Sequence, residues 1–311
     1  MVINVFNLQA GQLLRCLMAL LLVSCAFPNL AQEAAAYPLE AAGTWAQDQL
    51  SLIAERIGPG GGAELGQAML IDPDKVGSGD IILDVSEGAD AYIPRAVHIN
   101  YTALSGENKT LKPPEELAEI FGNAGISDKD SVVIYGECEP CGGSGVTLHP
   151  STYTYFALLS LGHQNLRMLD GGLKGWMAAG KPTTGNLSTR PAVRYIPYPR
   201  RDLQASISYV KENAVQLVDA RTIGEFGVSS IPGSVNIPAD RVAVNSSFCS
   251  DEELEMLFNG LSKDKPVVVY TATGLKASVV WFALEKMGYQ AKLFALGEWA
   301  RDNQPLVKPN Q

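Results

Sequence analysis

The sequence is poor in cysteine, histidine and positive charge, and each shortage excludes a class of protein. Five cysteines in 311 residues are too few for a disulfide scaffold. Three histidines argue against a histidine-rich metal site. A formal net charge of −9 argues against nucleic acid binding and against a polybasic membrane-binding surface. The sequence therefore predicts an acidic globular protein, long enough for two domains of ordinary size.

The N-terminus has an apolar run, residues 16–23, that is too short to span a bilayer. It follows Arg15 and has the length of the hydrophobic region of a signal peptide. It ends in Leu22-Val23-Ser24-Cys25, which resembles the bacterial lipobox, in which the cysteine is acylated and becomes the first mature residue. We therefore expect a signal peptide at residues 1–24, lipidation of Cys25 and a tether at residues 25–43.

The alternative at this end is ordinary cleavage after Asn29-Leu30-Ala31, which would give a soluble exported protein. The lipobox interpretation is favoured. If the sorting habit of bacterial lipoproteins holds, Ala26 after the cysteine indicates the outer membrane. The expected location is then the bacterial cell envelope, on its periplasmic or outer side, with membrane contact through the lipid alone.

The mature chain repeats one order of strands, turns and helices. The first copy has a strand at 80–85, a turn at Pro94, a helix from Pro113, a strand at 131–135 and a helix at 153–161. The second copy has a strand ending at Asp219, a turn at Pro232, a helix from Asp251, a strand ending at Tyr270 and a helix ending at Met287. Strands that alternate with helices predict an α/β fold, a mainly parallel sheet with helices on both faces in each of two domains. The expected boundaries are 44–182, a linker at 183–201, and 202–311.

Three motifs carry a family resemblance. They are Asp219-Ala220-Arg221, Ile231-Pro232-Gly233-Ser234-Val235-Asn236-Ile237-Pro238, and Leu169-Asp170-Gly171-Gly172 followed by Trp176. With the strand, loop and helix start at 267–278, they resemble the rhodanese (sulfurtransferase) family over nearly all of residues 80–299. The resemblance implies tandem rhodanese-like domains without a cofactor, in which the active cysteine usually lies in the second domain.

Thr271 occupies the position where that family has its nucleophilic cysteine. A threonine cannot form a persulfide, and no base adjoins it, so we expect this loop to be inactive in sulfur transfer. Thr271, Gly274 and Lys276 would at most bind an anion. The alternative is a relic loop that only caps its helix. Asp219 and Arg221 are expected to form a structural ion pair rather than a catalytic one.

The corresponding loop of the first domain is longer and carries Cys138 and Cys141. The span from Tyr135 to Gly162 is 162 − 135 = 27 positions, against 288 − 270 = 18 in the second domain, a nine-residue insertion. An insertion with the closely spaced cysteine pair of the mature chain suggests function at the edge of the active site. Gly142, Gly143 and Ser144 are the candidate substrate-binding residues of this loop. No lysine follows them, so nucleotide binding is set aside.

Three interpretations of the cysteine pair remain open. The pair could handle sulfur or redox equivalents, with Cys138 as acceptor and Cys141 as resolving thiol. It could be a static disulfide in an oxidising compartment. With His149 it could hold a soft metal, although this gives three ligands at best. Glu137 and Glu139 disfavour a thiolate here, and the loop has no lysine or arginine to attract anionic donors.

The leading hypothesis is binding or transfer of sulfur species, such as persulfide, polysulfide or thiosulfate, through Cys138 and Cys141. The expected partners are small sulfur species or a thiol-bearing protein. The rival hypothesis is a non-catalytic pseudo-sulfurtransferase that acts as an envelope interaction module, with a redox protein of the envelope as candidate partner. In that case the pair is a structural disulfide.

Overall fold

The computed structural model describes residues 69–107, 109–138 and 145–309. They belong to one compact unit, residues 63–311. The signal peptide, the tether and the lipidated Cys25 expected from the sequence lie outside the described residues. In the part of the chain that is described, no helix has the length and apolar character needed to cross a membrane.

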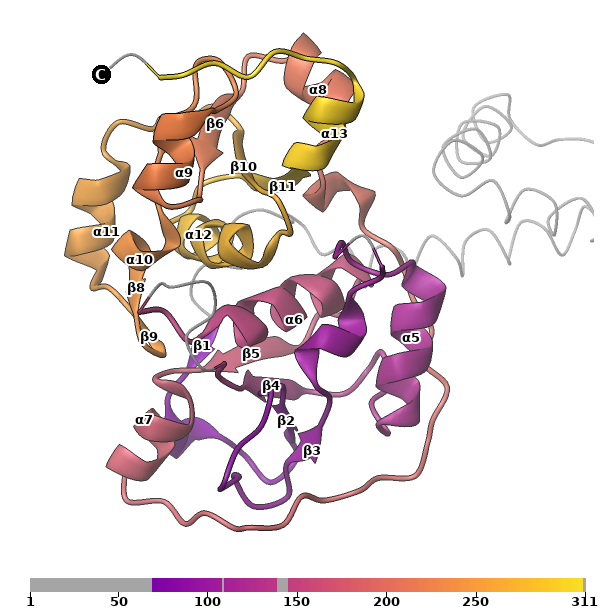
Figure 1. Ribbon diagram of the computed structural model, residues 1–311. Helices are drawn as coiled ribbons and strands as arrows, with labels where there is room; N and C mark the ends of the chain where they lie inside the picture. The colour runs from indigo at the N-terminus through magenta and orange to yellow at the C-terminus, as the bar shows by residue number, and fades with distance from the viewer. Residues whose placement is uncertain (1–68, 108, 139–144, 310–311) are drawn as a thin grey trace, which may run out of the picture. The chain divides into compact units, whose positions relative to one another are not determined.

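The first repeat is a five-stranded parallel sheet with the strand order β1-β5-β4-β2-β3 (Figure 1). Its elements are β1 (Leu70–Ile71), η1 (Pro73–Lys75), β2 (Ile81–Asp84), β3 (Val97–His98), η2 (Tyr101–Leu104), α5 (Pro114–Asn123), β4 (Val132–Tyr135), α6 (His149–Ser160), β5 (Leu166–Leu169) and α7 (Gly172–Ala178). Helix α6 begins at His149, four residues before the start expected from the apolar pattern. Pro150 in its first turn favours helix initiation, and the polar residues of this turn have partners in the fold, Ser151 with Gly136 of the first repeat and Thr152 with Ser278 of the second.

The second repeat has a four-stranded parallel sheet with the order β11-β10-β6-β7 and a separate hairpin. Its elements are η4 (Arg201–Leu203), α8 (Ile207–Glu212), β6 (Gln216–Asp219), α9 (Ile223–Val228), β7 (Val235–Asn236), α10 (Ala239–Val242), the hairpin strands β8 (Ala243–Val244) and β9 (Ser247–Phe248), α11 (Asp251–Phe258), β10 (Val267–Thr271), α12 (Leu275–Lys286), β11 (Ala291–Ala295) and α13 (Leu296–Arg301). A bridge between Gln204 and Leu293 takes the place that the β1–β5 pairing has in the first repeat.

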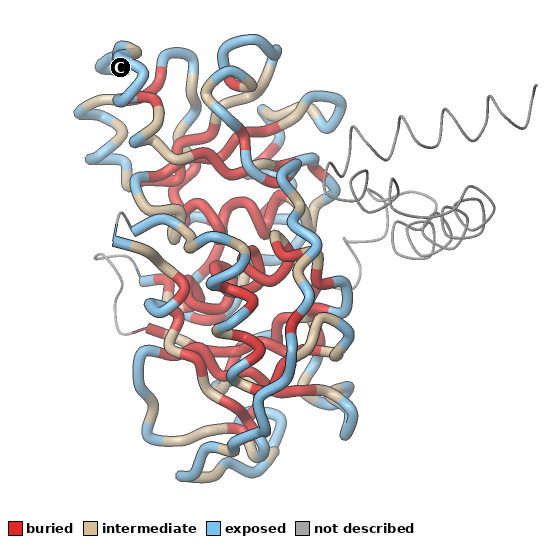
Figure 2. Tube along the Cα trace, turned by 90° about the vertical axis from the view of Figure 1, so that its right-hand side faces the viewer, coloured by how far each residue is buried: buried red, intermediate tan, exposed pale blue. Residues whose placement is uncertain are grey.

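Both sheets are buried on both faces, as the continuous apolar runs of their central strands predict. In β4, Val132 and Ile134 belong to the large core cluster, while Val133 and Tyr135 pack with Trp176 of α7 on the other face. In β10, Val267 and Val269 join the same large cluster. The α/β class with helices on both faces is confirmed, and buried residues run through both repeats (Figure 2).

Two pairs of hydrogen bonds repeat across the two halves. The hydroxyl of Tyr135 accepts from Ile93 N–H at 3.1 Å, and that of Tyr270 accepts from Ile231 N–H at the same distance. The indoles donate to proline carbonyls six residues further on, Trp176 to Pro182 at 2.8 Å and Trp299 to Pro305 at 3.0 Å. These bonds show that Tyr135 corresponds to Tyr270 and Trp176 to Trp299 in the two repeats.

Residues 185–200 have no helix or strand and pack along the first repeat. The Val193 N–H donates to the Gly122 carbonyl at 2.9 Å, and the Tyr198 N–H donates to the Leu161 carbonyl at 2.7 Å. Gly162 has a positive φ of 82°, and a Cβ there would lie 2.4 Å from the Tyr198 carbonyl oxygen. A glycine is thus required where this segment crosses the end of α6.

The repeats join through α6 and α12, which cross at equivalent positions (Figure 1). Thr152 and Ser278, each the fourth residue of its helix, share a hydrogen bond of 2.8 Å in the core. The next equivalent positions also meet, with Phe156 edge-on against Trp281 and Tyr155 edge-on against Phe282. Contacts that exchange equivalent positions define a local pseudo-twofold axis, as in an isologous dimer. The loops that precede both helices therefore lie near this axis.

Candidate functional site

The pairing of the strands in the two sheets shows which loop residues of the two repeats correspond. Asp84 pairs with Tyr135 in the first sheet, and Asp219 pairs with Tyr270 in the second. The next residues are Gly136 and Thr271, at the carboxyl ends of β4 and β10 in their respective sheets, where ligands bind in open α/β sheets. The interval from this tyrosine to the following helix is 149 − 135 = 14 positions in the first repeat and 275 − 270 = 5 in the second, which confirms the nine-residue insertion.

The loop of the second repeat is closed by the side chain of Thr271. Its hydroxyl oxygen accepts a hydrogen bond from Gly274 N–H at 2.9 Å, and the residue is 3% exposed. Gly274 has φ 83°, a conformation that favours glycine at a helix start. One amide that would face an anion is therefore already satisfied within the loop. This hydrogen bond closes the turn before α12 and does not cap the helix itself, whose N-cap is Gly274.

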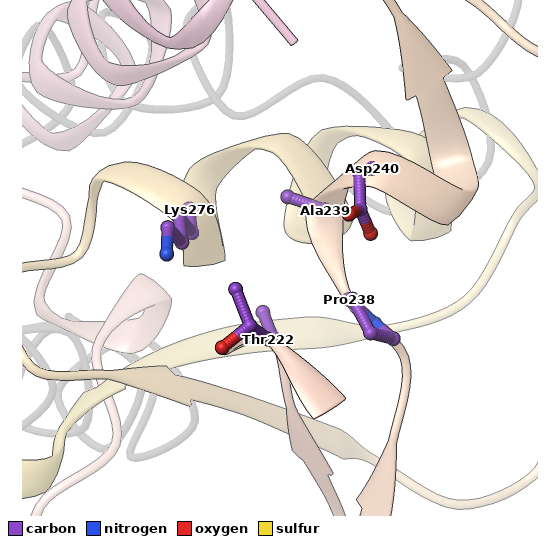
Figure 3. A pocket seen from close by; sticks show the side chains of 6 residues that line it. Thr222, Pro238, Ala239, Asp240 and Lys276 are labelled. Atoms are coloured by element: carbon purple, nitrogen blue, oxygen red, sulfur yellow. The ribbon is translucent and has the colours of Figure 1, made fainter. Parts of the chain in front are cut away.

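Lys276, the second residue of α12, forms an ion pair with Glu225 at 3.4 Å. It borders a shallow hollow of about 160 Å³, part of it open solvent, together with Thr222, Pro238 and Asp240 (Figure 3). The acidic groups of Glu225 and Asp240 reduce the attraction of this hollow for anions. The positive charge expected to bind substrate is thus shared with a carboxylate of the same repeat.

Asp219 and Arg221 form the structural network predicted for them. The Arg221 guanidinium donates to both carboxylate oxygens of Asp219, at 2.9 and 2.6 Å, and also to the Ser229 carbonyl at 2.6 Å. Asp219 is fully buried and Arg221 is 8% exposed. This bidentate pair stabilises the end of β6 and the loop after it, and leaves the guanidinium little freedom to contact a substrate.

In the first repeat, the corresponding buried carboxylate is Asp84, and its partners do not include an arginine. Asp84 is fully buried, and its carboxylate accepts from Ser86 Oγ at 2.9 Å and lies 2.6 Å from His98 Nδ1. Burial raises the pKa of Asp84 in spite of the hydrogen bonds from His98 and Ser86. His98 is therefore part of the hydrogen-bond network that holds the end of β2.

Gly136 stands where the family nucleophile would stand in the first repeat, and no side chain fits there. A Cβ on Gly136 would lie 2.5 Å from Ser86 N, and its φ is 150°. Its carbonyl accepts from Ser151 Oγ at 2.8 Å. A cysteine in the first repeat can therefore lie only further along the loop, and Cys138 is two positions on.

Cys138 is 2% exposed, and its sulfur is bonded in a disulfide whose partner lies outside the described residues. Its N–H donates to the Thr147 carbonyl at 3.0 Å, so the two ends of the insertion are held together. The other residues proposed for this site, Cys141, Gly142, Gly143 and Ser144, also lie outside the described residues. Cys249, the free cysteine of the described part, is partly buried and donates to the Arg241 carbonyl at 3.5 Å.

The charge environment of the insertion differs from the one expected from the loop sequence. Glu137 was expected to disfavour a thiolate at Cys138, but it forms an ion pair with Lys174 of α7 at 3.4 Å. Its carboxylate also accepts from Thr147 Oγ1 at 3.0 Å. A positive charge therefore reaches the loop from 174 − 137 = 37 positions away, which local sequence could not indicate.

The insertion also binds the second repeat. The Thr147 N–H donates to the Asn245 carbonyl and the Asn245 N–H donates to the Gly145 carbonyl, both at 2.9 Å. Asn245 lies in the turn of the β8–β9 hairpin with a positive φ of 52°. Ser246 Oγ donates to the Gly171 carbonyl at 3.1 Å. The cysteine loop is thus attached to both repeats.

His149 is the first residue of α6, and from the sequence it was considered only as a metal ligand. It is fully buried, and neither ring nitrogen has a hydrogen-bond partner among the described residues. Burial and the positive charge of Lys276 lower its pKa from 6.5 to about 4, although the Val146 carbonyl favours the charged ring. The internal repeat could have indicated that His149 is unusual. His149 is the first residue of α6, and the first residue of the equivalent helix α12 is the apolar Leu275.

One interpretation of the loop was a soft-metal site with Cys138, Cys141 and His149 as ligands. Among the described residues, no three histidine, cysteine or acidic side chains come together as metal ligands would. Cys141, one of the ligands considered, falls outside them.

Two parallel α/β units, joined helix to helix and each with a loop leading from the central strand into a helix start, define the class of this protein. The model of the family described as rhodanese-like domain matches residues 67–179 and 206–298. The chain belongs to the rhodanese-like sulfurtransferase family, in its tandem form.

Relatives of known name agree with this assignment. A Mycobacterium tuberculosis protein named provisionally as a thiosulfate sulfurtransferase is 29% identical over 253 residues, covering 70% of this chain and 87% of the relative. The sulfur carrier protein TtuD of Thermus thermophilus is 30% identical over 213 residues, covering 60% of this chain and 72% of the relative. The crystal structure of SseA from Escherichia coli, a 3-mercaptopyruvate sulfotransferase with the rhodanese fold, superposes with a TM-score of 0.64 at 22% identity, covering 74% of this chain and 98% of that one.

Proposed function

We propose that the protein binds and transfers sulfane sulfur through Cys138 and Cys141 of the first repeat. The position of Gly136 supports this location, because neither repeat has a cysteine directly after its central strand. Cys138 is the nearest cysteine to that position and lies in the insertion that contacts both repeats. The ion pair of Glu137 with Lys174 also removes part of the negative charge that would repel an anionic donor.

The chemistry requires the reduced pair. The Cys138 thiolate attacks the sulfane sulfur of thiosulfate, the S–S bond of the donor breaks, and sulfite leaves with the electron pair. Cys138 then carries a persulfide. The Cys141 thiol loses its proton and attacks Cys138 Sγ, which forms a disulfide and releases hydrosulfide. Two thiols of a protein partner would return the pair to the reduced state by exchange, and are themselves oxidised to a disulfide. A thiol acceptor that attacks the persulfide first would instead take the sulfur.

The test is the intact mass of the purified chain after reduction and exposure to thiosulfate or polysulfide. A reducible gain of one sulfur atom that maps to Cys138 or Cys141 is expected. A Cys249→Ser variant serves as control, because it removes the free thiol of the second repeat. A disulfide that resists mild reduction, with no sulfur gained by the reduced chain, would refute sulfur transfer.

A second candidate function is a non-catalytic interaction module with a static disulfide. The observation that favours it is the burial of Cys138, which is 2% exposed and whose N–H donates to the Thr147 carbonyl at the other end of the insertion. Replacement of both loop cysteines by alanine separates the candidates. A module keeps its partner, for example an envelope redox protein, whereas a sulfur carrier loses its persulfide.

We also propose that the chain is exported and held at the outer membrane of a bacterial envelope by lipid on Cys25. The support is the sequence Leu22-Val23-Ser24-Cys25 after a short apolar run. A Cys25→Ser variant should move from the membrane fraction to the soluble exported fraction, if it is cleaved at Ala31, or remain as unprocessed precursor. An unchanged, fully processed and membrane-bound variant would contradict lipidation at this residue.

A further inference from the structure

Thr147 connects Cys138 of the first repeat to the β8–β9 hairpin of the second. Its carbonyl oxygen accepts a hydrogen bond from Cys138 N–H at 3.0 Å, and its own N–H donates to the Asn245 carbonyl at 2.9 Å. The Asn245 N–H donates in turn to the Gly145 carbonyl at 2.9 Å. Two residues of the insertion are therefore bonded to one residue of the other repeat, and one of the two also holds the cysteine.

The hairpin is fixed both at its turn and at its base. Strands β8 and β9 enclose the two-residue turn 245–246. Ser246 Oγ donates to the Gly171 carbonyl, next to α7 of the first repeat, at 3.1 Å. The ring of Phe248 stacks on Phe282 of α12, with the two centroids 5.1 Å apart. The turn therefore has a defined position against the first repeat, and the hairpin connects it to the core of the second.

Asn245 suits this turn because of its backbone conformation. Its φ is 52°, in the left-handed region, where a side chain strains most residues. Asparagine and glycine adopt this conformation at the least cost, whereas a β-branched residue is strongly disfavoured. Asn303, in the turn after α13, has a similar φ of 53° and donates to the Ala300 carbonyl. Of these two asparagines with the same backbone conformation, Asn245 is the one bonded to the cysteine insertion.

The disulfide of Cys138 and the hairpin act on the same stretch of backbone. A cross-linked cysteine has less conformational freedom than a free thiol, and the N–H of Cys138 holds the Thr147 carbonyl. The disulfide therefore keeps Thr147 in place for its bond to Asn245. Coupling of this kind is reciprocal, so a disulfide that strengthens the hairpin contact is itself stabilised by that contact to the same extent.

We propose that Asn245 is a positioning residue for Cys138, and that its bonds to Gly145 and Thr147 stabilise the disulfide against reduction. Reduction takes two electrons and two protons from a dithiol, which becomes a disulfide as Cys138 and its partner become thiols. The proposal concerns regulation of the proposed sulfur-transfer site and rests on that function for its consequence, because only the reduced pair accepts sulfur. The second repeat then sets how readily the first becomes reactive.

The first test is the reduction equilibrium of the Cys138 disulfide in the intact chain against dithiothreitol, measured by alkylation of free thiols and mass spectrometry. Asn245→Val should shift this equilibrium about tenfold towards the thiols, which is within the usual range for two coupled sites. The corresponding reduction potential is about 30 mV less negative. Asn245→Gly keeps the left-handed turn and should stay within about twofold of wild type.

Asn303→Val is the matched control for the variant of Asn245. It places the same β-branched side chain at the same backbone conformation, in the turn after α13. Its reduction equilibrium should equal that of wild type. An Asn245→Val equilibrium equal to that of Asn303→Val, or a shift towards the disulfide, would overturn the proposal.

Hydrogen exchange of the wild-type chain tests the reverse direction without any substitution. Reduction of the disulfide should speed exchange of the Thr147 and Asn245 amides by about tenfold, because the coupling is reciprocal. The Gly274 amide, bonded to Thr271 Oγ1 within the second repeat, is the internal control. Unchanged exchange at Thr147 and Asn245 would refute the coupling, whatever the behaviour of the variants.

The result is distinguishable from that for sulfur transfer, because neither measurement uses a sulfur donor. A shifted equilibrium for Asn245→Val in a chain that takes up no sulfur would support this proposal and refute the transfer reaction. Sulfur uptake by the reduced chain, with an Asn245→Val equilibrium equal to that of wild type, would do the reverse.

Discussion

The two repeats have the same frame but differ at the three positions that decide their chemistry. The buried carboxylate at the end of β2, Asp84, is held by Ser86 and His98, and the one at the end of β6, Asp219, is held by Arg221. The residue after the tyrosine of the central strand is Gly136 in one repeat and Thr271 in the other. The loop that follows is nine positions longer in the first repeat.

This comparison teaches that the frame tolerates loss of the family nucleophile in both copies. The core hydrogen bonds of Tyr135 and Tyr270 are the same at 3.1 Å, although neither loop has a cysteine directly after its strand. Stability is therefore carried by the buried strands and by the α6–α12 junction, which leaves the loops free to diverge. Four predictions test how far the repeats are one unit and how far they differ.

The largest effect is expected from Trp281→Ala at the junction. Trp281 is fully buried and packs edge-on against Phe156 of the first repeat. Removing its ring should cost about 3–5 kcal/mol of unfolding free energy. The loss should appear in both repeats as one transition, in denaturant unfolding and in hydrogen exchange of the β4 and β10 amides.

Trp299→Ala is the matched control for that change, since Trp299 packs within the second repeat. It should destabilise β10 and β11 before it affects β4. Exchange of the β4 amides that is unaffected by Trp281→Ala would show that the repeats unfold independently.

The next effect separates the two positions after the central strands. Gly136→Ala places a Cβ about 2.5 Å from the Ser86 nitrogen and should cost about 3 kcal/mol through strain and displacement of the backbone. Thr271→Ala loses only the hydrogen bond from Gly274 and should cost about 1 kcal/mol. Urea midpoints of the two variants measure the difference. Equal losses would mean that the glycine is not required by the close approach of the chain.

Much of this frame could be predicted from the sequence. The buried strands β2, β6 and β10 are largely continuous apolar runs bounded by turn residues, and such runs are determined locally. The insertion could be measured because both helices end at a glycine, Gly162 and Gly288. Repetition of the pattern supplied the fold class.

The candidate site was harder to predict, because its contacts join distant segments. His149 to Thr152 look like the end of a polar loop, and only the contact with Ser278 makes them a buried helix start. Lys174 reaches Glu137 through the fold of α7. The neutral state of His149 follows from its burial and from Lys276 of the other repeat, which no local pattern of the sequence expresses.

The third prediction concerns pH and the asymmetry between His149 and Leu275. The folded pKa of His149 is about 4 and its ordinary value is 6.5, so the unfolded chain binds more protons between these values. Stability from the neutral ring is complete above pH 6.5 and is lost as the pH falls towards 4. At about 1.4 kcal/mol for each pH unit, the contribution reaches at most about 3.5 kcal/mol.

The measurement is the difference in unfolding free energy between wild type and His149→Leu from pH 4 to 7. Burial raises the pKa of Glu285 to about 7, which lowers stability as the pH rises through the same range. Because Glu285 is present in both proteins, its effect cancels in the difference. The variant should therefore gain relative stability as the pH falls. A difference that does not change with pH would contradict a buried neutral imidazole.

The smallest effects are expected at the two ion pairs that flank the loops, Lys174–Glu137 and Lys276–Glu225, both with a separation of 3.4 Å. The side chain of Lys174 is 64% exposed and that of Lys276 is 20% exposed, so water screens the first pair more. Replacing either lysine with glutamine should cost less than about 1 kcal/mol. Unfolding free energies at low and high salt should show that the Lys174→Gln loss disappears with salt, while part of the Lys276→Gln loss persists. If the order were reversed, the loop of the first repeat would depend on its ion pair more than that of the second, and the exposure of the two lysines would not determine their contribution.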